Sequence, residues 1–185
     1  MGEETTYIRF FAAINVKTVN ALIQTIERKL KEGAERFVLL ISSGGGNVGS
    51  GISGYNFLRG IPAEVTTHNF GVVDSVAVVL FCGGAKRLCV PHARFLLHGI
   101  GFDVNNPTRF DEKRLDEEMK GLRMHRENIG RIIADSCGRG TKEVDQDILA
   151  SVVLGSKQAV DYGLVHEIKS DLLPKGVEVI GIVDS

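Results

Sequence analysis

Residues 37–46 read FVLLISSGGG, and this stretch decides the class of fold. Its first part, FVLLI, is entirely apolar, as expected of a strand that is buried on both faces of a parallel sheet. Consecutive glycines follow at 44–46, and the chain then continues through Leu58 with a pattern that is compatible with a helix. A strand, a glycine-rich turn and a helix in this order are typical of an α/β protein.

The same alternation extends in both directions along the chain. Upstream, the apolar run at 7–11 predicts a strand, and apolar residues at three- and four-residue steps over 16–30 predict a helix. Downstream, the sequence predicts a strand at 63–67, a connection at 68–74 and a short apolar helix at 75–81. The remaining elements are predicted as strands at 87–90, 94–97, 164–168 and 177–183 and as helices at 142–149 and 156–162.

A long helix is predicted over 109–136, where the apolar residues fall roughly on one stripe and charged residues crowd the other positions. At about 1.5 Å per residue this helix would be about 40 Å long, which is more than a domain of this size can cover. Gly138 and Gly140 follow it and are expected to end it. We therefore expect the helix to project from the body and to be buried against a partner subunit.

The composition indicates one ordinary globular domain. The chain has 185 residues, of which 43% are hydrophobic and 24% charged, and its net charge is -1. This charge gives nucleic acid or an anionic membrane no electrostatic reason to bind. The start of the chain is acidic and is no signal peptide, and no apolar run approaches the ~20 residues of a membrane helix. Cys82, Cys89 and Cys137 are in no metal-ligand spacing, so we expect free thiols in the cytoplasm and no metal.

Ser75 has the most informative setting among the residues that could do chemistry. It follows the turn 71–74 and begins the apolar helix at 75–81. One interpretation is an ordinary N-cap, whose hydroxyl accepts a backbone N–H. The other is a nucleophile presented to a cleft at a helix N-terminus, which favours developing negative charge. The surrounding residues do not match the Gly-x-Ser-x-Gly pattern of α/β-hydrolases, and position alone leaves both interpretations open.

The glycines at 44–46 and His98 could each assist such a nucleophile. Glycines let the backbone approach a ligand closely and aim N–H groups at an oxyanion, although they also occur in any tight turn. A phosphate-binding loop is disfavoured because no Gly-Lys-Ser/Thr follows. His98 ends the apolar strand 95–97, where a histidine can be a general base or an exposed side chain. None of the 5 histidines stands in a metal-binding spacing.

These signals occur in the order of a known family. The stretch 37–46 resembles the strand and "NSPGG" turn of the ClpP family of serine peptidases, and 71–76 (GVVDSV) is similar to its "GQAASM" nucleophile segment. Residues 85–91 (AKRLCVP) resemble "KRFCLP", and 94–98 (RFLLH) resemble the strand that carries its histidine. Residues 159–165 (AVDYGLV) then resemble "AVEYGLVD". The likeness covers most of the chain.

The resemblance implies an α/β fold of the ClpP/crotonase type, with repeated β-β-α layers and a long projecting handle helix. It implies that Ser75 is the nucleophile, that His98 is its base, and that the backbone N–H groups of Gly46 and Val76 form the oxyanion hole. It divides the single domain into a head, residues 1–105 and 141–185, and a handle, residues 106–140. The subunits are expected to form rings that cleave peptides or unfolded protein without a cofactor; an ATPase partner of the AAA+ type stays open.

The sequence departs from the family at the third member of the triad. The family's aspartate stands eight residues before the position of Ala159, which in this chain is Ser151. Asp147, one helical turn earlier, could replace it if that turn faces His98. Asp74 also precedes the nucleophile where the family has a small residue, and its charge would oppose an oxyanion unless the side chain points away.

Two alternatives to an active peptidase remain open at this stage. A catalytically degenerate ring subunit would keep the fold and the assembly with little catalysis, and the residues at 74 and 151 favour it. A crotonase-type acyl-CoA enzyme shares the fold and the oxyanion hole, but the Ser75–His98 pair and the short chain argue against it.

Overall fold

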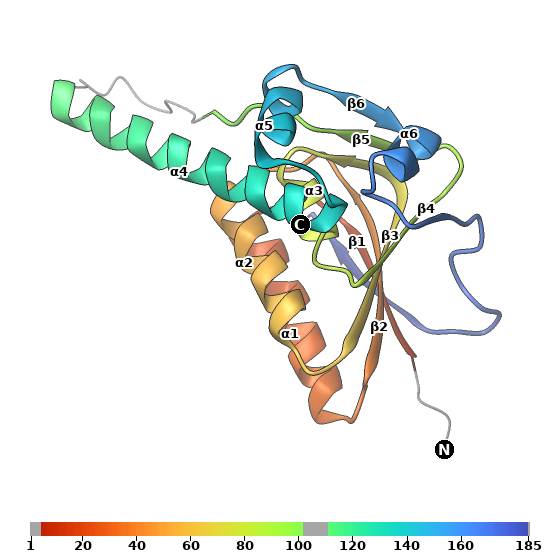
Figure 1. Ribbon diagram of the computed structural model, residues 1–185. Helices are drawn as coiled ribbons and strands as arrows, with labels where there is room; N and C mark the ends of the chain where they lie inside the picture. Colours follow the sequence, from red (N-terminus) through yellow and green to blue (C-terminus); the bar gives the residue numbers. More distant parts are fainter. Residues whose placement is uncertain (1–4, 102–110, 185) are drawn as a thin grey trace.

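The computed structural model describes residues 5–101 and 111–184, and it is organised around one eight-stranded sheet (Figure 1). The strands are β1 (Thr5–Phe11), β2 (Arg36–Ser43), β3 (Glu64–Asp74), β4 (Lys86–Cys89), β5 (Arg94–Leu96), β6 (Val153–Gly155), β7 (Glu167–Ile168) and β8 (Val179–Val183). The helices are α1 (Val16–Lys31), α2 (Val48–Gly60), α3 (Val76–Phe81), α4 (Glu112–Cys137), α5 (Thr141–Leu149) and α6 (Ser156–Asp161). The α/β class expected from the sequence is confirmed.

The sheet follows the order β6-β5-β3-β2-β1-β8, and its strands are parallel except for the antiparallel pair β5–β6. On the side away from β2, strand β3 divides its pairing between two neighbours. Its first half pairs with β4, from Thr66 opposite Lys86, and its end pairs with β5, where Asp74 lies opposite Leu96. The ends of β3 and β5 therefore lie side by side, which brings the residues after them close together.

The prediction of a connection at 68–74 was wrong, because these residues continue β3. Polar residues and a glycine suggested a loop, but His68 and Asn69 are only 1% and 0% exposed. Both polar side chains find buried partners: His68 Nε2 lies 3.0 Å from the carbonyl oxygen of Lys169, and Asn69 Nδ2 donates to the carbonyl of Arg94 at 2.9 Å. Satisfied polar groups can be buried in a strand without the usual penalty.

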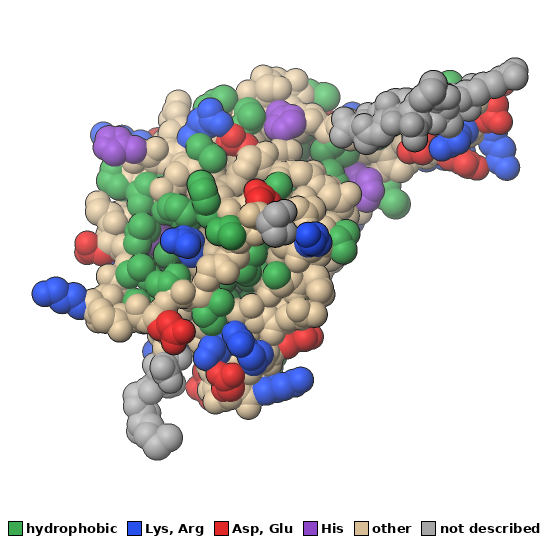
Figure 2. Space-filling model, turned by 180° about the vertical axis from the view of Figure 1, so that it is seen from behind, with side chains coloured by type: hydrophobic (Ala, Val, Ile, Leu, Met, Phe, Trp, Pro, Cys, Tyr) green, Lys and Arg blue, Asp and Glu red, His purple; other side chains and the backbone are tan. Residues whose placement is uncertain are grey.

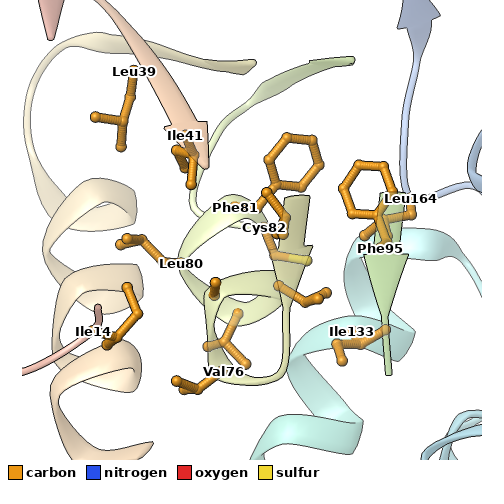
Figure 3. Close-up of a cluster of buried hydrophobic side chains, with 14 of the residues drawn as sticks. Ile14, Leu39, Ile41, Val76, Leu80, Phe81, Cys82, Phe95, Ile133 and Leu164 are labelled. Carbon is orange, nitrogen blue, oxygen red and sulfur yellow. The ribbon is translucent and has the colours of Figure 1, made fainter. Parts of the chain in front are cut away.

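Helix α3 lies at the centre of the core. All of its residues, from Val76 to Phe81, are at most 1% exposed. Figure 3 shows its side chains between Leu39 and Ile41 of β2 on one side and Phe95 of β5 on the other. The rings of Phe81 and Phe95 pack edge to face with centroids 5.2 Å apart. Because the helix is surrounded by packed side chains, the residue at its N-terminus is held in a fixed position.

Two glycines of α2 allow that helix to lie directly against α3. A Cβ atom at Gly51 would lie 2.3 Å from Cγ2 of Val76, and one at Gly54 would lie 2.7 Å from Cδ1 of Leu80. These approaches leave no room for any larger residue unless the core shifts. The spacing of helix α2 from α3 is therefore set by residues that the sequence analysis did not single out.

Helix α4 projects from the body, as expected (Figure 1). Its buried residues, Ile129, Gly130, Ile133 and Ala134, all lie in its second half. In the first half, Leu115 is 47% exposed. Residues 109 and 110, where the helix was predicted to begin, lie outside the described residues. Among the described helices, none has both the length and the apolar character to cross a membrane. The division into a head and a handle at 105 and 141 stays a prediction.

The C-terminal ends of α3, α4 and α6 meet at the buried guanidinium of Arg87, which is 6% exposed. Its Nη1 donates to the carbonyl of Gly84 at 3.4 Å, just after α3, and its Nη2 donates to the carbonyl of Ser136 in α4 at 2.7 Å. Beyond α6, Nε and Nη2 donate to the carbonyls of Leu164 at 2.8 Å and Gly163 at 3.3 Å. One cation thus satisfies the terminal carbonyls of several helices and offsets the negative ends of their dipoles.

Replacing Arg87 with methionine is expected to lower the free energy of unfolding by roughly 3 kcal/mol, because buried carbonyl groups lose their charged donor. Urea denaturation followed by circular dichroism measures this change. Lys86→Met is the matched control, since the Lys86 side chain is 56% exposed in a surface ion pair with Glu167. This control should shift the stability by less than about 1 kcal/mol. Equal losses in both variants would show that Arg87 has no special role.

Candidate active site

Ser75 has a backbone conformation that few non-glycine residues adopt. It joins β3 to α3 with φ 59° and ψ -134°, and its N–H donates to the carbonyl of Leu96 at 2.8 Å. Its side chain makes no capping hydrogen bond to the helix that follows. The N-cap interpretation of Ser75 is therefore wrong. A strained backbone of this kind costs about 1–3 kcal/mol and occurs mainly at functional sites, and here it leaves a half-buried hydroxyl uncommitted.

The glycine turn packs directly against this serine. A Cβ atom at Gly45 would lie 2.6 Å from the Cβ of Ser75, and one at Gly46 would lie 2.2 Å from the carbonyl oxygen of Ile14. Both glycines also have positive φ angles, 94° and 144°. The turn is held by hydrogen bonds from Ile14 N–H to the Gly45 carbonyl, 2.8 Å, and from Asn47 N–H to the Ile14 carbonyl, 2.7 Å. These contacts require glycine at 45 and 46 and fix the loop beside Ser75.

The N–H groups expected to form the oxyanion hole are not used elsewhere in the described part of the chain. Gly45 N–H donates to Ser43 Oγ at 3.2 Å, whereas no hydrogen bond is found for Gly46 N–H. Val76 N–H belongs to the first turn of α3, where backbone donors have no partner within the helix. Gly46 and Val76 therefore present free donors on the two segments that flank Ser75, and their role as an oxyanion hole stays a prediction.

His98 lies two residues beyond the end of β5, the strand whose last residue bonds to Ser75. The carbonyl of Leu96 accepts the Ser75 N–H, and the N–H of Leu97 donates to the carbonyl of Val152 at 2.9 Å. The two residues before His98, Leu96 and Leu97, are therefore held by hydrogen bonds to neighbouring segments. The side chain of His98 is half-buried. Within residues 5–101 and 111–184, no hydrogen bond joins His98 to Ser75. Catalytic hydrogen bonds often tighten only when substrate binds, and the pairing of Ser75 with His98 stays a prediction.

Ser151 comes directly before the segment that pairs with β5. In the antiparallel pair β5–β6, Leu96 is opposite Val153 and the Leu97 N–H donates to the carbonyl of Val152, so a continuation of this register by one residue would place Ser151 opposite His98. Ser151 has φ 55°, and among the described non-glycine residues only Ser75 shares a positive φ. Aspartate and asparagine tolerate this left-handed conformation better than other residues. The backbone at 151 therefore has a shape suited to an aspartate, but the chain has a serine there.

Asp147 is occupied by a different partner. Its Oδ2 accepts a hydrogen bond from the hydroxyl of Tyr162 at 2.7 Å. The guanidinium of Arg139 lies over the ring of Tyr162, 4.1 Å from its centroid. Burial, together with the hydrogen bond to Asp147, raises the pKa of the Tyr162 hydroxyl well above its usual value. Within the described residues no hydrogen bond or ion pair joins Asp147 to His98, so its role as the third catalytic residue stays a prediction.

The carboxylate of Asp74, directly before Ser75, is neutralised by an ion pair with Arg94 on β5. Its side chain is 10% exposed, and its Oδ1 is buried without a hydrogen bond. Side chains alternate along a strand, so Asp74 lies on the face opposite that of Val73, which is fully buried in the core. The sequence analysis missed Arg94 as the partner, because the pairing of β3 with β5 was not visible in the sequence.

The cysteines belong to the core and not to a metal site. Cys82 and Cys89 are buried free thiols, and burial raises the pKa of each to about 11. Cys137 is also free, and burial raises its pKa to about 12. These thiols stay protonated and unreactive at neutral pH. In the described ranges no group of three or more His, Cys, Asp or Glu side chains could hold a metal ion.

A comparison with protein families matches residues 4–171 to the Clp protease family. The chain belongs to this family. Similar curated sequences are ATP-dependent Clp protease proteolytic subunits. That of Oltmannsiellopsis viridis is 28% identical over 140 residues, 75% of this chain and 70% of the relative. That of Chlorella vulgaris is 30% identical over 135 residues, 72% of this chain and 65% of the relative.

A solved structure supports the same fold. A mutant of ClpP1 from Listeria monocytogenes superposes with a TM-score of 0.79, at 22% identity, over 90% of this chain and 91% of that one. At this identity the likeness concerns the fold alone. Together with the family match it confirms the ClpP-like fold expected from the sequence, and the family match decides against the crotonase-type alternative.

Proposed function

We propose that this member of the Clp protease family is a serine endopeptidase subunit that cleaves peptides or unfolded polypeptides by acyl transfer, without a cofactor. The observation that carries the proposal is the state of Ser75. Its backbone is strained, its hydroxyl does not cap the helix, and it stands at the N-terminus of the fully buried helix α3. A nucleophilic hydroxyl must be free to react with the substrate and must be held in a fixed position, and Ser75 meets both requirements.

In this mechanism Ser75 Oγ attacks the carbonyl carbon of the scissile peptide bond while its proton passes to His98. The carbonyl oxygen becomes an oxyanion, which the N–H groups of Gly46 and Val76 stabilise together with the positive end of α3. The C–N bond then breaks and His98 gives its proton to the departing amine. In the second half of the reaction His98 takes a proton from a water molecule, whose oxygen attacks the carbonyl carbon of the acyl-enzyme ester. The bond from that carbon to Ser75 Oγ then breaks, Oγ takes the proton back from His98, and the second peptide is released.

A second candidate function is a catalytically degenerate subunit that keeps the fold and the assembly. Two observations favour it. Ser151 stands at the position where the family resemblance puts the residue that orients His98, and the nearby carboxylate of Asp147 is bound to Tyr162. A neutral serine can orient an imidazole but supplies no charge to stabilise the imidazolium. We therefore propose that turnover by the natural chain is slow.

Hydrolysis of fluorogenic peptides separates these two functions. The purified protein is expected to release the fluorophore slowly but measurably, and Ser75→Ala is expected to abolish that release. Ser53→Ala is the matched control, because Ser53 lies on the exposed side of α2 and its hydroxyl bonds only to the carbonyl of Gly49. Release that is absent from the natural protein, under conditions where it is folded and assembled, would favour the degenerate subunit.

We further propose that the chain assembles into rings and that two rings stack through α4. The proposed compartment is the cytoplasm, and we assign the protein no ATPase partner. Two surfaces support assembly. The apolar side chains Leu115 and Met119 on the projecting half of α4 are 47% and 43% exposed. Hydrophobic side chains also gather over the middle of the face seen in Figure 2. At the ends of β1 and β8, Phe11 and Val183 are 58% and 53% exposed. Parallel sheets are normally covered on both faces, so a neighbouring subunit is the natural cover.

Sedimentation velocity should find the natural protein as a large oligomer, and the double variant Leu115→Glu, Met119→Glu should be markedly smaller. The substitutions place charge on apolar contacts without touching the core, since both side chains are exposed in the single chain. Lys113→Glu, at a side chain that is 86% exposed, is the control that changes charge on the same helix. A natural protein that sediments as a monomer would contradict the proposal of rings.

A further inference from the structure

A groove of about 640 Å³ lies between helix α4 and the N-terminal end of α2. One wall is formed by residues 46–49, and another by Ile100 and Gly101. The third wall is one stripe of α4, whose members are three or four residues apart and include Glu118, Leu122 and His125. The groove is therefore enclosed by three segments that are far apart in the sequence.

The groove begins at the candidate active site. Gly46 belongs both to its wall and to the turn that packs against Ser75. Ile100, on the second wall, comes shortly after His98 in the chain. Consecutive Cα atoms are about 3.8 Å apart, so the groove starts within a few residues' length of the two reacting side chains. A peptide whose carbonyl reaches Ser75 can therefore place a side chain in this groove.

Two polar groups in the groove have no partner in the described part of the chain. Glu118 is half-buried and makes no ion pair there, whereas its neighbours Asp116 and Glu117 pair with lysines on the same helix. His125, two turns further along the same stripe, has a buried Nδ1 without a hydrogen bond. The carboxylate of Glu118 is therefore available to a ligand of opposite charge in the groove. The His125 atom is closed to solvent and does not contact a ligand there.

We propose that the groove binds a cationic side chain of the substrate, lysine or arginine, close to the peptide bond that is cleaved. Glu118 pairs with the cation through its carboxylate. Val48 and Leu122 also line the groove, and they pack against the methylene stem of the side chain. The inference rests on the proposed function and adds the class of substrate to it.

The α-amino group of a peptide is a second source of the same positive charge. A groove that bound it would favour the free N-terminus of a substrate and not an internal residue. The groove has apolar walls of Val48, Ile100 and Leu122, which suit the long stem of lysine or arginine better than a terminal amine. Acetylated peptides remove the terminal charge, so they separate the two sources.

Binding of fluorescent peptides to the Ser75→Ala protein tests the inference independently of catalysis. Lysine is placed at each position in turn of an acetylated hexapeptide, and every peptide is compared with its norleucine counterpart by fluorescence anisotropy. At one position lysine is expected to bind roughly tenfold more tightly than norleucine, because a charge pair beside apolar walls is weakly screened. Arginine at that position should share the preference.

The groove carboxylate is tested by two further substitutions in the same protein. Glu118→Gln should remove the preference for lysine, and Glu118→Lys should replace it with a preference for glutamate. Glu117→Gln is the control, because Glu117 is adjacent but exposed and pairs with Lys113 on the same helix. It should leave the preference for lysine unchanged.

Equal binding of lysine and norleucine at every position would overturn the inference, whether or not the natural protein cleaves peptides. Tight binding of a norleucine peptide only when its N-terminus is free would overturn it in favour of the terminal amine. Conversely, a preference for lysine that depends on Glu118 supports the inference even if the natural protein proves inactive, in which case the proposed catalysis alone fails.

Discussion

Ser75→Ala and His98→Ala are each expected to lower kcat by about 10³-fold or more, and the double variant is expected to lose little beyond either one. Members of a catalytic unit act in one step, so once one is missing the other has nothing to contribute. The measurement is the hydrolysis of one fluorogenic peptide by the natural protein and the three variants. His92→Ala is the control for histidine, since His92 is an exposed residue in the turn before β5.

Two results would contradict this expectation. Peptide cleavage that survives in Ser75→Ala would refute the assignment of the nucleophile. If the kcat losses of the two single variants multiply in the double variant, then Ser75 and His98 act independently. One of them would then take part in the chemistry while the other stabilises the fold. Circular dichroism of each variant shows that the fold is kept and makes the comparison valid.

Ser151→Asp is expected to raise kcat by about 10²-fold or more. The worked triad case loses about 10⁴ when the carboxylate becomes an amide, so restoring a carboxylate beside His98 can recover part of that range. The backbone at Ser151 already has φ 55°, which aspartate tolerates, and a continuation of the β5–β6 register by two residues would place it opposite His98. The assay compares steady-state hydrolysis of one peptide by both proteins.

Ser151→Asn and Asp147→Asn complete this experiment. Asparagine at position 151 has the shape of aspartate without its charge, so Ser151→Asn should raise kcat much less than Ser151→Asp. Asp147→Asn should change kcat only slightly, because that side chain bonds to the hydroxyl of Tyr162 and an amide oxygen can accept the same bond. A fast natural protein that is crippled by Asp147→Asn and indifferent to Ser151→Asp would show that Asp147 is the third catalytic residue.

The fold could be predicted because its elements have strong local signals. The apolar run of β2 and the three- and four-residue spacing in α1 predict their structure regardless of the rest of the chain. The error at 68–74 has a physical cause, since His68 and Asn69 read as loop residues until their partners, at Lys169 and Arg94, are known. Such partners come from distant parts of the sequence, and no local pattern contains them.

The candidate site could be predicted only in part, for a similar reason. The order of motifs drew attention to Ser75 and His98, but the sequence left the N-cap interpretation open, and only the backbone angles of Ser75 and its uncommitted hydroxyl decide against it. The neutralisation of Asp74 by Arg94 depends on the pairing of β3 with β5. The binding of Asp147 in α5 to Tyr162, just after α6, likewise depends on contacts that only the folded chain makes.

Labelling with a fluorophosphonate probe tests the central claim, an activated serine at position 75, most directly. The probe reacts with a serine only when a base and an oxyanion hole activate it, and it needs no substrate preference to do so. The account predicts one adduct per chain, which mass spectrometry maps to Ser75 and which disappears in Ser75→Ala and His98→Ala. A folded protein that is not labelled, or that is labelled at a different serine, would contradict it.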